Sequence, residues 1–135
     1  MARADLLLVL LSWASHLSHY PYPDKAPVYR LEPHSFFVEH ACGGNEKCSI
    51  AAWYNNNGII YLDNRMQDWD NPVVRSVIVH ELVHYLQDLS GKFKNDDCED
   101  QLMRERQAYA VQRMYLNRVA GRFAAVYPVY NSCPK

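Results

Sequence analysis

The sequence lacks an excess of charge of either sign, because 14 Lys and Arg residues stand against 15 Asp and Glu residues in a chain of 135. Nucleic-acid binding needs an excess or a stripe of basic residues, so no nucleic-acid partner is expected. A chain without excess positive charge also has no electrostatic reason to bind strongly acidic partners. Low-complexity tracts are also absent, and the 49% apolar and 21% charged fractions are ordinary for a globular protein. We predict a single domain over residues 1–135.

No apolar run is long enough to cross a bilayer, which takes about 20 consecutive residues. The run in residues 6–17 is interrupted by Ser12, Ser15 and His16. It is either a core helix or a signal peptide, and the charge and cleavage cues for the latter are weak. We prefer a helix that opens at a capping Asp5 and therefore expect no membrane span. Its apolar stripe would hold Leu7, Leu10, Leu11, Ala14 and Leu17.

The four cysteines do not show the CxxC spacing that is typical of small zinc sites. An even number in a short chain instead indicates two disulfides and export to an oxidising compartment, periplasmic or extracellular. We favour Cys42 with Cys48, which closes a short polar loop, and Cys98 with Cys133, which ties the C-terminal tail to the start of a helix. Four reduced cysteines and a cytoplasmic location remain the alternative.

Turn signals and periodicity predict an α+β fold whose order is one helix, three strands and two helices. Residues 28–38 are rich in aromatic and β-branched side chains, which predicts a strand with an irregularity around Pro33. A run of three Asn and one Gly joins residues 49–54 to residues 59–62. Because these residue types tolerate the backbone of tight turns, the two segments are predicted to form a hairpin.

Two long helices follow the predicted hairpin. Asn71 before Pro72 predicts the start of the first, which should end near Gly91. The second should run from residue 97 or 98 to about residue 120, and residues 122–135 should form an extended tail. The core stripe of the first helix would hold Val74, Ile78, Leu82, Tyr85 and Leu89.

The first of these helices contains the string His80-Glu81-Leu82-Val83-His84, which is an HExxH motif. Residues four apart share a helix face, so both imidazoles can reach one zinc ion. Glu81 lies about 100° further round the helix, where it is poorly placed as a ligand of the same ion. It is well placed to act as a general base on a water molecule beside the metal. The alternative is two solvated histidines on a surface helix.

Catalytic zinc sites use three protein ligands, so the histidine pair leaves one position to fill. Glu105 in the second long helix is the candidate, because the small Ala108 one turn later permits a close approach of the two helices. Three rival carboxylates lie at the start of that helix, where capping and helix-dipole roles explain them without a metal. These rivals are Asp97, Glu99 and Asp100.

At these residues the sequence resembles the gluzincin clan of zinc metallopeptidases, through HExxH and the downstream Glu105-x-x-Ala108. It looks most like minimal, single-domain gluzincins and is also similar to uncharacterised bacterial domains that share the string over residues 80–87. The resemblance implies a zincin-like fold with an N-terminal helix, a small three-stranded sheet, the HExxH helix and the Glu-bearing helix. It implies that His80, His84 and Glu105 bind one catalytic Zn²⁺ ion.

One position departs from the family pattern. Several gluzincins carry an Asp after the Glu-x-x-Ser/Ala element, which bonds a ligand histidine, whereas this chain has Tyr109 there. The Tyr109 hydroxyl could accept that bond or stabilise an oxyanion in catalysis. Alternatively, Tyr109 is only a half-buried aromatic between helices.

These residues together predict a zinc-dependent metallopeptidase in which Glu81 is the general base. The strand over residues 59–62, from Ile59 to Leu62, should lie beside the HExxH helix and offer its edge to an extended peptide or protein substrate. Two other classes stay open. One is a zinc-stabilised binding or inhibitory domain with little catalysis, and the other is an exported structural module without metal.

Overall fold

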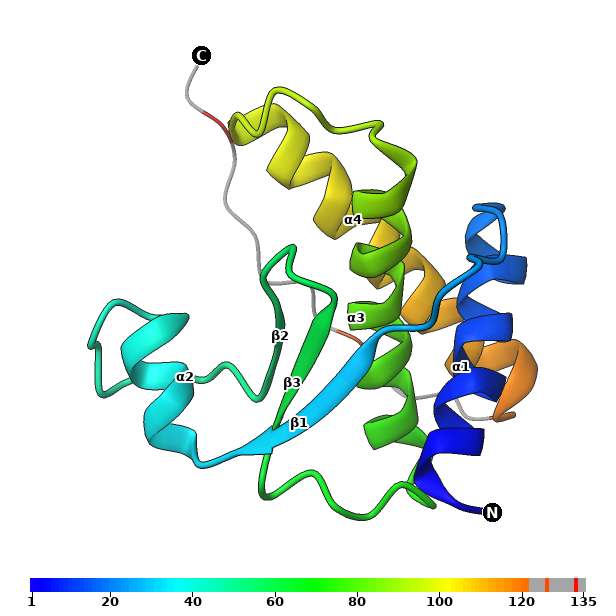
Figure 1. Ribbon diagram of the computed structural model, residues 1–135, viewed down its shortest axis with the longest axis horizontal. Helices are drawn as coiled ribbons and strands as arrows, with labels where there is room; N and C mark the ends of the chain where they lie inside the picture. The colour runs from blue at the N-terminus through cyan, green and yellow to red at the C-terminus, as the bar shows by residue number, and fades with distance from the viewer. Residues whose placement is uncertain (122–125, 127–132, 134–135) are drawn as a thin grey trace.

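The structure is a computed structural model that describes residues 1–121, 126 and 133. It has the predicted α+β architecture, with an N-terminal helix, a three-stranded mixed sheet and two long packed helices (Figure 1). The elements in chain order are α1 (Arg3–Ser18), β1 (Val28–Glu32), α2 (His34–His40), β2 (Ala52–Tyr54), β3 (Ile59–Asp63), α3 (Pro72–Ser90), α4 (Cys98–Met114) and a π-helical turn, η1 (Tyr115–Val119).

The sheet has the order β1-β3-β2, so the last strand in sequence is the central one. β2 and β3 form the predicted antiparallel hairpin, with Trp53 opposite Tyr61, whereas β1 pairs with β3 in parallel. Alternate residues of these strands point to opposite faces, and Tyr54, Ile60 and Leu62 are buried in the core shared with the helices.

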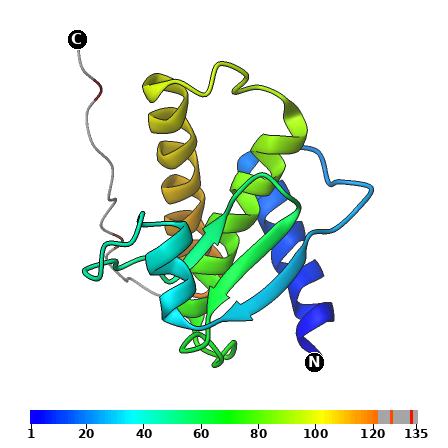
Figure 2. The same cartoon turned by 60° about the vertical axis from the view of Figure 1, so that its left-hand side comes forward.

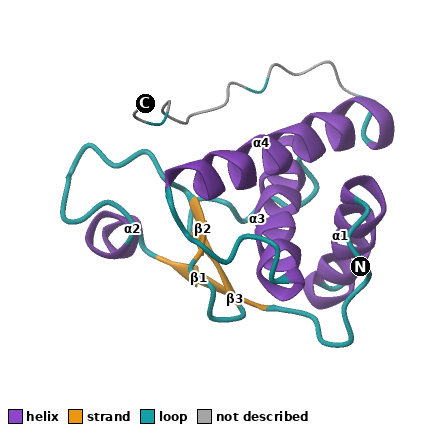
Figure 3. Ribbon diagram, turned by 90° about the horizontal axis from the view of Figure 1, so that it is seen from above, coloured by secondary structure: helices purple, strands orange, loops and turns teal. Residues whose placement is uncertain are grey.

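Helix α3 lies between the sheet and α1, and α4 packs across it (Figures 1 and 3). This central position explains its burial, because neighbours cover α3 on several sides. The predicted apolar stripe of α1 is confirmed, since all five of its residues are buried. Figure 2 shows α2 on the face of the sheet that is turned away from α3.

The prediction of a strand over residues 28–38 is wrong in its second half. The strand ends at Glu32, and α2 begins directly after Pro33, whose carbonyl accepts a hydrogen bond from Phe36 N at 2.9 Å. Proline has no N–H for a strand ladder, so it ends the strand there. Phe37 is fully buried on α2, and this packing overrides the β propensity of the aromatic residues.

Smaller corrections concern the ends of elements. Asp5 lies in the first turn of α1 rather than at its cap, because the helix already begins at Arg3. β2 starts at Ala52 rather than at residue 49. Leu89 is 56% exposed, so it does not belong to the core stripe of α3. The second long helix becomes π-helical at its end, and the predicted tail over residues 122–135 lies largely outside the described residues.

Both predicted disulfides, Cys42–Cys48 and Cys98–Cys133, are formed. The first closes the loop after α2, and the second joins the first residue of α4 to the C-terminal segment. Within the part of the chain that the structure describes, no helix is both long enough and apolar enough to cross a bilayer.

Candidate metal centre

Local sequence signals set the position of α3, which carries the HExxH motif. Asn71 caps the helix, since its side chain accepts a hydrogen bond from Val73 N at 2.9 Å. Gly91 ends it with φ +66°, a left-handed conformation that glycine adopts without a steric penalty. Ile78 and Leu82 are fully buried in the core, so the helix is held in a fixed rotation.

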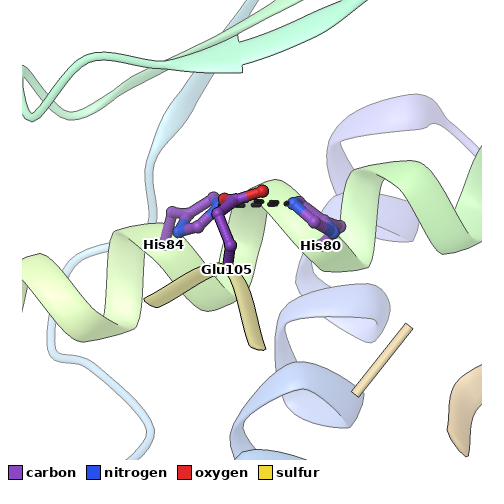
Figure 4. Close-up of side chains that lie close together, drawn as sticks. All are labelled: His80, His84 and Glu105. Carbon is purple, nitrogen blue, oxygen red and sulfur yellow. Dashed lines mark hydrogen bonds and ion pairs between the residues drawn. The ribbon is translucent and has the colours of Figure 1, made fainter. Parts of the chain in front are cut away.

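Side chains from α3 and α4 converge on one point (Figure 4). His80 Nε2 and His84 Nε2 lie 3.3 Å apart. Glu105 Oε1 lies 2.5 Å from His84 Nε2 and 3.6 Å from His80 Nε2. Of the described residues, these three form the group in which ligand atoms of His, Cys, Asp or Glu are close enough together to hold a metal ion. The pair from the HExxH helix and the predicted third residue are therefore brought together.

The electrostatics of the group are those of a closely coupled ion pair. Burial by itself would raise the pKa of Glu105, but hydrogen bonds from His80 and His84 and their charges outweigh it and lower this pKa to about 2. Burial also opposes a charge on His84, yet the hydrogen bond to Glu105 and the Glu81 and Glu105 charges raise the pKa of His84. Because its pKa is about 2, Glu105 is ionised at neutral pH, and its carboxylate is ready to bind a cation.

The three residues line a cleft of about 970 Å³. One wall is the segment of residues 49–56, which contains β2, and the other is formed by α3 and α4. Glu81 also lines the cleft, with Oε2 3.9 Å from His80 Nε2. Glu81 therefore lines the same space as the histidines. Most of its surface is covered, since the residue is only 7% exposed.

Two glutamines that the sequence analysis did not identify hold the outer nitrogens of the imidazoles. Gln112 Oε1 lies 2.9 Å from His80 Nδ1, and Gln87 Oε1 lies 2.8 Å from His84 Nδ1. Both glutamines are buried. The spacing of three residues from His84 to Gln87 is a signal that could have revealed one of them, since residues three apart on a helix are neighbours.

The other candidate residues have different surroundings. Asp97, one of the alternative third ligands, caps α4 by accepting a hydrogen bond from Asp100 N at 2.9 Å. This is the capping role that the sequence predicts for it. The Tyr109 ring meets the edge of the His80 ring at 4.4 Å between centroids, and Tyr109 lines the cleft. The atom that faces His80 Nδ1 as a hydrogen-bond partner belongs to Gln112, however.

The expectation for the strand of residues 59–62 needs correction. β3 is central and is paired over this whole length, with β1 on one side and β2 on the other, so its backbone has no free edge. β2 is the strand that packs against α3 and lines the cleft. Among the described residues, no strand pairs with the outer edge of β2.

Comparisons of the chain with known protein families, with curated proteins and with solved structures found no match. Two imidazole nitrogens, one carboxylate and a nearby second carboxylate in an open cleft make a candidate metal centre with room for a ligand.

Proposed function

We propose that this protein is a zinc-dependent metallopeptidase of the gluzincin type. The observation that carries the proposal is the convergence of His80 Nε2, His84 Nε2 and Glu105 Oε1 beside Glu81. The candidate ligands lie on two helices, α3 and α4, that pack against each other. The packed helices form a rigid support, which a pair of histidines on a surface helix would lack. The alternative of two solvated histidines is not favoured, because His80 is only 5% exposed.

The donor set fits zinc in kind and in spacing. Nitrogen and carboxylate oxygen ligands bind zinc at about 2.0–2.2 Å, and donors of a tetrahedral site then lie about 3.4 Å from one another. The separations of 3.3 Å between the histidine nitrogens and 3.6 Å from His80 to Glu105 agree with this value. The shorter 2.5 Å contact from Glu105 to His84 is a hydrogen bond, which a metal ion would replace.

Zinc at this position would supply a Lewis acid that polarises a carbonyl group and acidifies a water molecule. Glu81 then accepts a proton from the attacking water and returns it to the amine that leaves. The low exposure of Glu81 limits competing solvent around its carboxylate. Tyr109 lines the same cleft with its ring against His80, and we assign its hydroxyl to the stabilisation of the oxyanion.

The substrate is a peptide segment in extended conformation, bound along β2. The outer edge of β2 offers backbone N–H and C=O groups to an added strand, a recurring mode of peptide recognition. Residues 49–56 form the wall of the cleft opposite the candidate ligands. A peptide on this edge would therefore run past His80 and His84.

The two disulfides support a location outside the reducing cytosol, in the periplasm or the extracellular space.

The test combines metal analysis with peptide hydrolysis. Protein purified without added zinc should contain about one zinc per chain, and it should cleave members of a mixed peptide library until a chelator is added. Glu81→Gln should retain the zinc and lose at least about 100-fold in turnover, since general acid–base catalysis contributes about 10²–10⁴-fold. Zinc-loaded protein that cleaves nothing would support a binding or inhibitory domain instead, and absence of metal would favour a structural module.

A further inference from the structure

A neutral imidazole carries its proton on one of two nitrogens, and only the bare nitrogen can bind a metal. His80 and His84 point their Nε2 atoms at the candidate metal position and their Nδ1 atoms at buried glutamines. An amide offers either an acceptor oxygen or a donor NH₂ group, so its orientation decides which imidazole nitrogen holds the proton.

The orientation of Gln87 is determined by a backbone carbonyl. Its Nε2 lies 3.0 Å from the carbonyl oxygen of Arg104, which can only accept a hydrogen bond, and 3.1 Å from Gln107 Oε1. The NH₂ group must therefore point to Arg104, and Oε1 points to Nδ1 of His84 at 2.8 Å. Gln87 is 2% exposed, so water cannot easily exchange for these partners.

The orientation of Gln112 is determined in the same way through one more group. Ser76 Oγ donates its proton to the carbonyl oxygen of Val73 at 2.7 Å. It can then only accept from Gln112 Nε2, which lies 3.2 Å away. Oε1 of Gln112 is left to face Nδ1 of His80 at 2.9 Å. Each chain of hydrogen bonds thus begins at a backbone carbonyl and ends at a candidate ligand.

We propose that Gln87 and Gln112 are positioning residues that favour the tautomer of His84 and His80 with the proton on Nδ1. At His84 this tautomer forms when a metal ion replaces the hydrogen bond from Nε2 to Glu105, and Nε2 then binds the metal. This inference rests on the proposed metal centre and adds how its ligands are prepared. A carboxylate partner would make a ligand imidazole more basic, whereas a neutral amide sets the same tautomer without adding charge. The site then keeps Glu105 as the one anionic ligand.

Nitrogen-15 NMR of the metal-free protein tests the inference at His80 without any activity measurement. At an alkaline pH where the imidazoles are neutral, the wild-type protein should show the His80 proton on Nδ1. Gln112→Leu, which removes the acceptor, should shift the proton to Nε2 or leave a mixture of both tautomers. Gln112→Glu restores an acceptor, and the nearby Ser76 hydroxyl can turn to donate to it, so Nδ1 should again carry the proton.

Zinc affinity, measured by competition with a chelator, gives the second readout. Gln112→Leu should weaken zinc binding about 10–100-fold, the usual effect of losing a partner of a ligand histidine, and Gln112→Glu should recover most of it. Gln67→Leu changes an exposed glutamine in the loop after β3 and serves as the control, with zinc affinity unchanged. Circular dichroism of each variant shows whether it is folded.

Gln87 gives a matched contrast, because its NH₂ group faces two acceptor oxygens. A carboxylate in Gln87→Glu would meet the Arg104 carbonyl and Gln107 Oε1 with no proton to donate, so rescue by Glu should fail here while it succeeds at Gln112. An unchanged His80 tautomer and unchanged zinc affinity in folded Gln112→Leu would overturn the inference. If the wild-type protein showed the Nδ1 tautomer but did not bind zinc, the role of Gln112 in orienting His80 would be supported. Only the proposed function would then be refuted.

Discussion

The two walls of the cleft are built in different ways. On the wall made by α3 and α4, the candidate ligands are buried or half-buried, and each imidazole has a buried glutamine, Gln87 or Gln112, as its partner. On the opposite wall, residues 49–56 belong mostly to an edge strand and the exposed turn after it, and the outer backbone edge of β2 is paired with no described strand.

The difference separates two tasks. A metal centre needs ligands that are held in place before the ion arrives, and buried helix packing achieves this. A peptide site needs unsatisfied backbone groups that a partner can use, which only an edge can offer. Changes to the candidate ligands and to their buried partners on the helix wall should therefore weaken metal binding. Changes on the sheet side should alter stability or peptide binding without altering metal binding.

The largest effect expected from this comparison is at Glu105. Glu105→Ala removes one of the three candidate ligands and should weaken zinc binding by more than about 100-fold, because loss of a partner outside the ligands already costs about 10–100-fold. Equilibrium competition with a chelator measures the change. Glu99→Ala is the matched control, since Glu99 is an exposed carboxylate in the first turn of the same helix. Equal loss in the two variants would remove Glu105 from the ligand set.

The two disulfides should differ in their contribution to stability, and neither should matter for zinc affinity. The loop closed by Cys98 and Cys133 has a separation of 35 residues, which corresponds to about 4 kcal/mol of loop-closure free energy, whereas the separation of 6 between Cys42 and Cys48 corresponds to about 2 kcal/mol. Paired Cys→Ser variants, followed by urea unfolding, would show this order. Weaker zinc binding in the Cys42/Cys48 variant would contradict the separation of the two walls.

Much of the candidate site could be predicted from the sequence because its signals are local. The spacing of His80 and His84 places both on one helix face whatever the rest of the fold does. The small Ala108 one turn after Glu105 predicts the close approach of the two helices, and the Glu105-x-x-Ala108 string matches the gluzincin pattern. Ala108 is fully buried in the core, and Glu105 meets His84.

The buried glutamines and the order of the strands could not be predicted in this way. Glutamine in a helix is usually an exposed polar residue, and only the packing of α4 against α3 turns Gln112 inward. The pairing of β1 with β3 is a long-range contact, so the sequence of a hairpin does not reveal which of its strands becomes central. For that reason the free edge was assigned to β3 rather than to β2.

The smallest effect in this series concerns Asp63, at the end of β3 on the sheet side. Its carboxylate is 1% exposed and bonds Arg65 at 2.8 Å and His34 at 2.8 Å. Hydrogen bonds from Arg65 are the main cause that lowers the pKa of Asp63 to about 2, with His34 contributing, against the opposing effect of burial.

Because the folded pKa of Asp63 lies below its unfolded value of 3.8, its ionised form stabilises the fold above that value. This contribution of up to about 2 kcal/mol should be lost as the pH falls from about 4 to about 2. Asp63→Asn should be less stable near neutral pH and should lose this part of the acid dependence, while zinc affinity at neutral pH stays unchanged. Asp24→Asn, at an exposed aspartate, should keep the wild-type acid dependence in urea unfolding at a series of pH values. If Asp63→Asn weakened zinc binding as strongly as Glu105→Ala, the sheet side would have to be counted as part of the support of the metal centre.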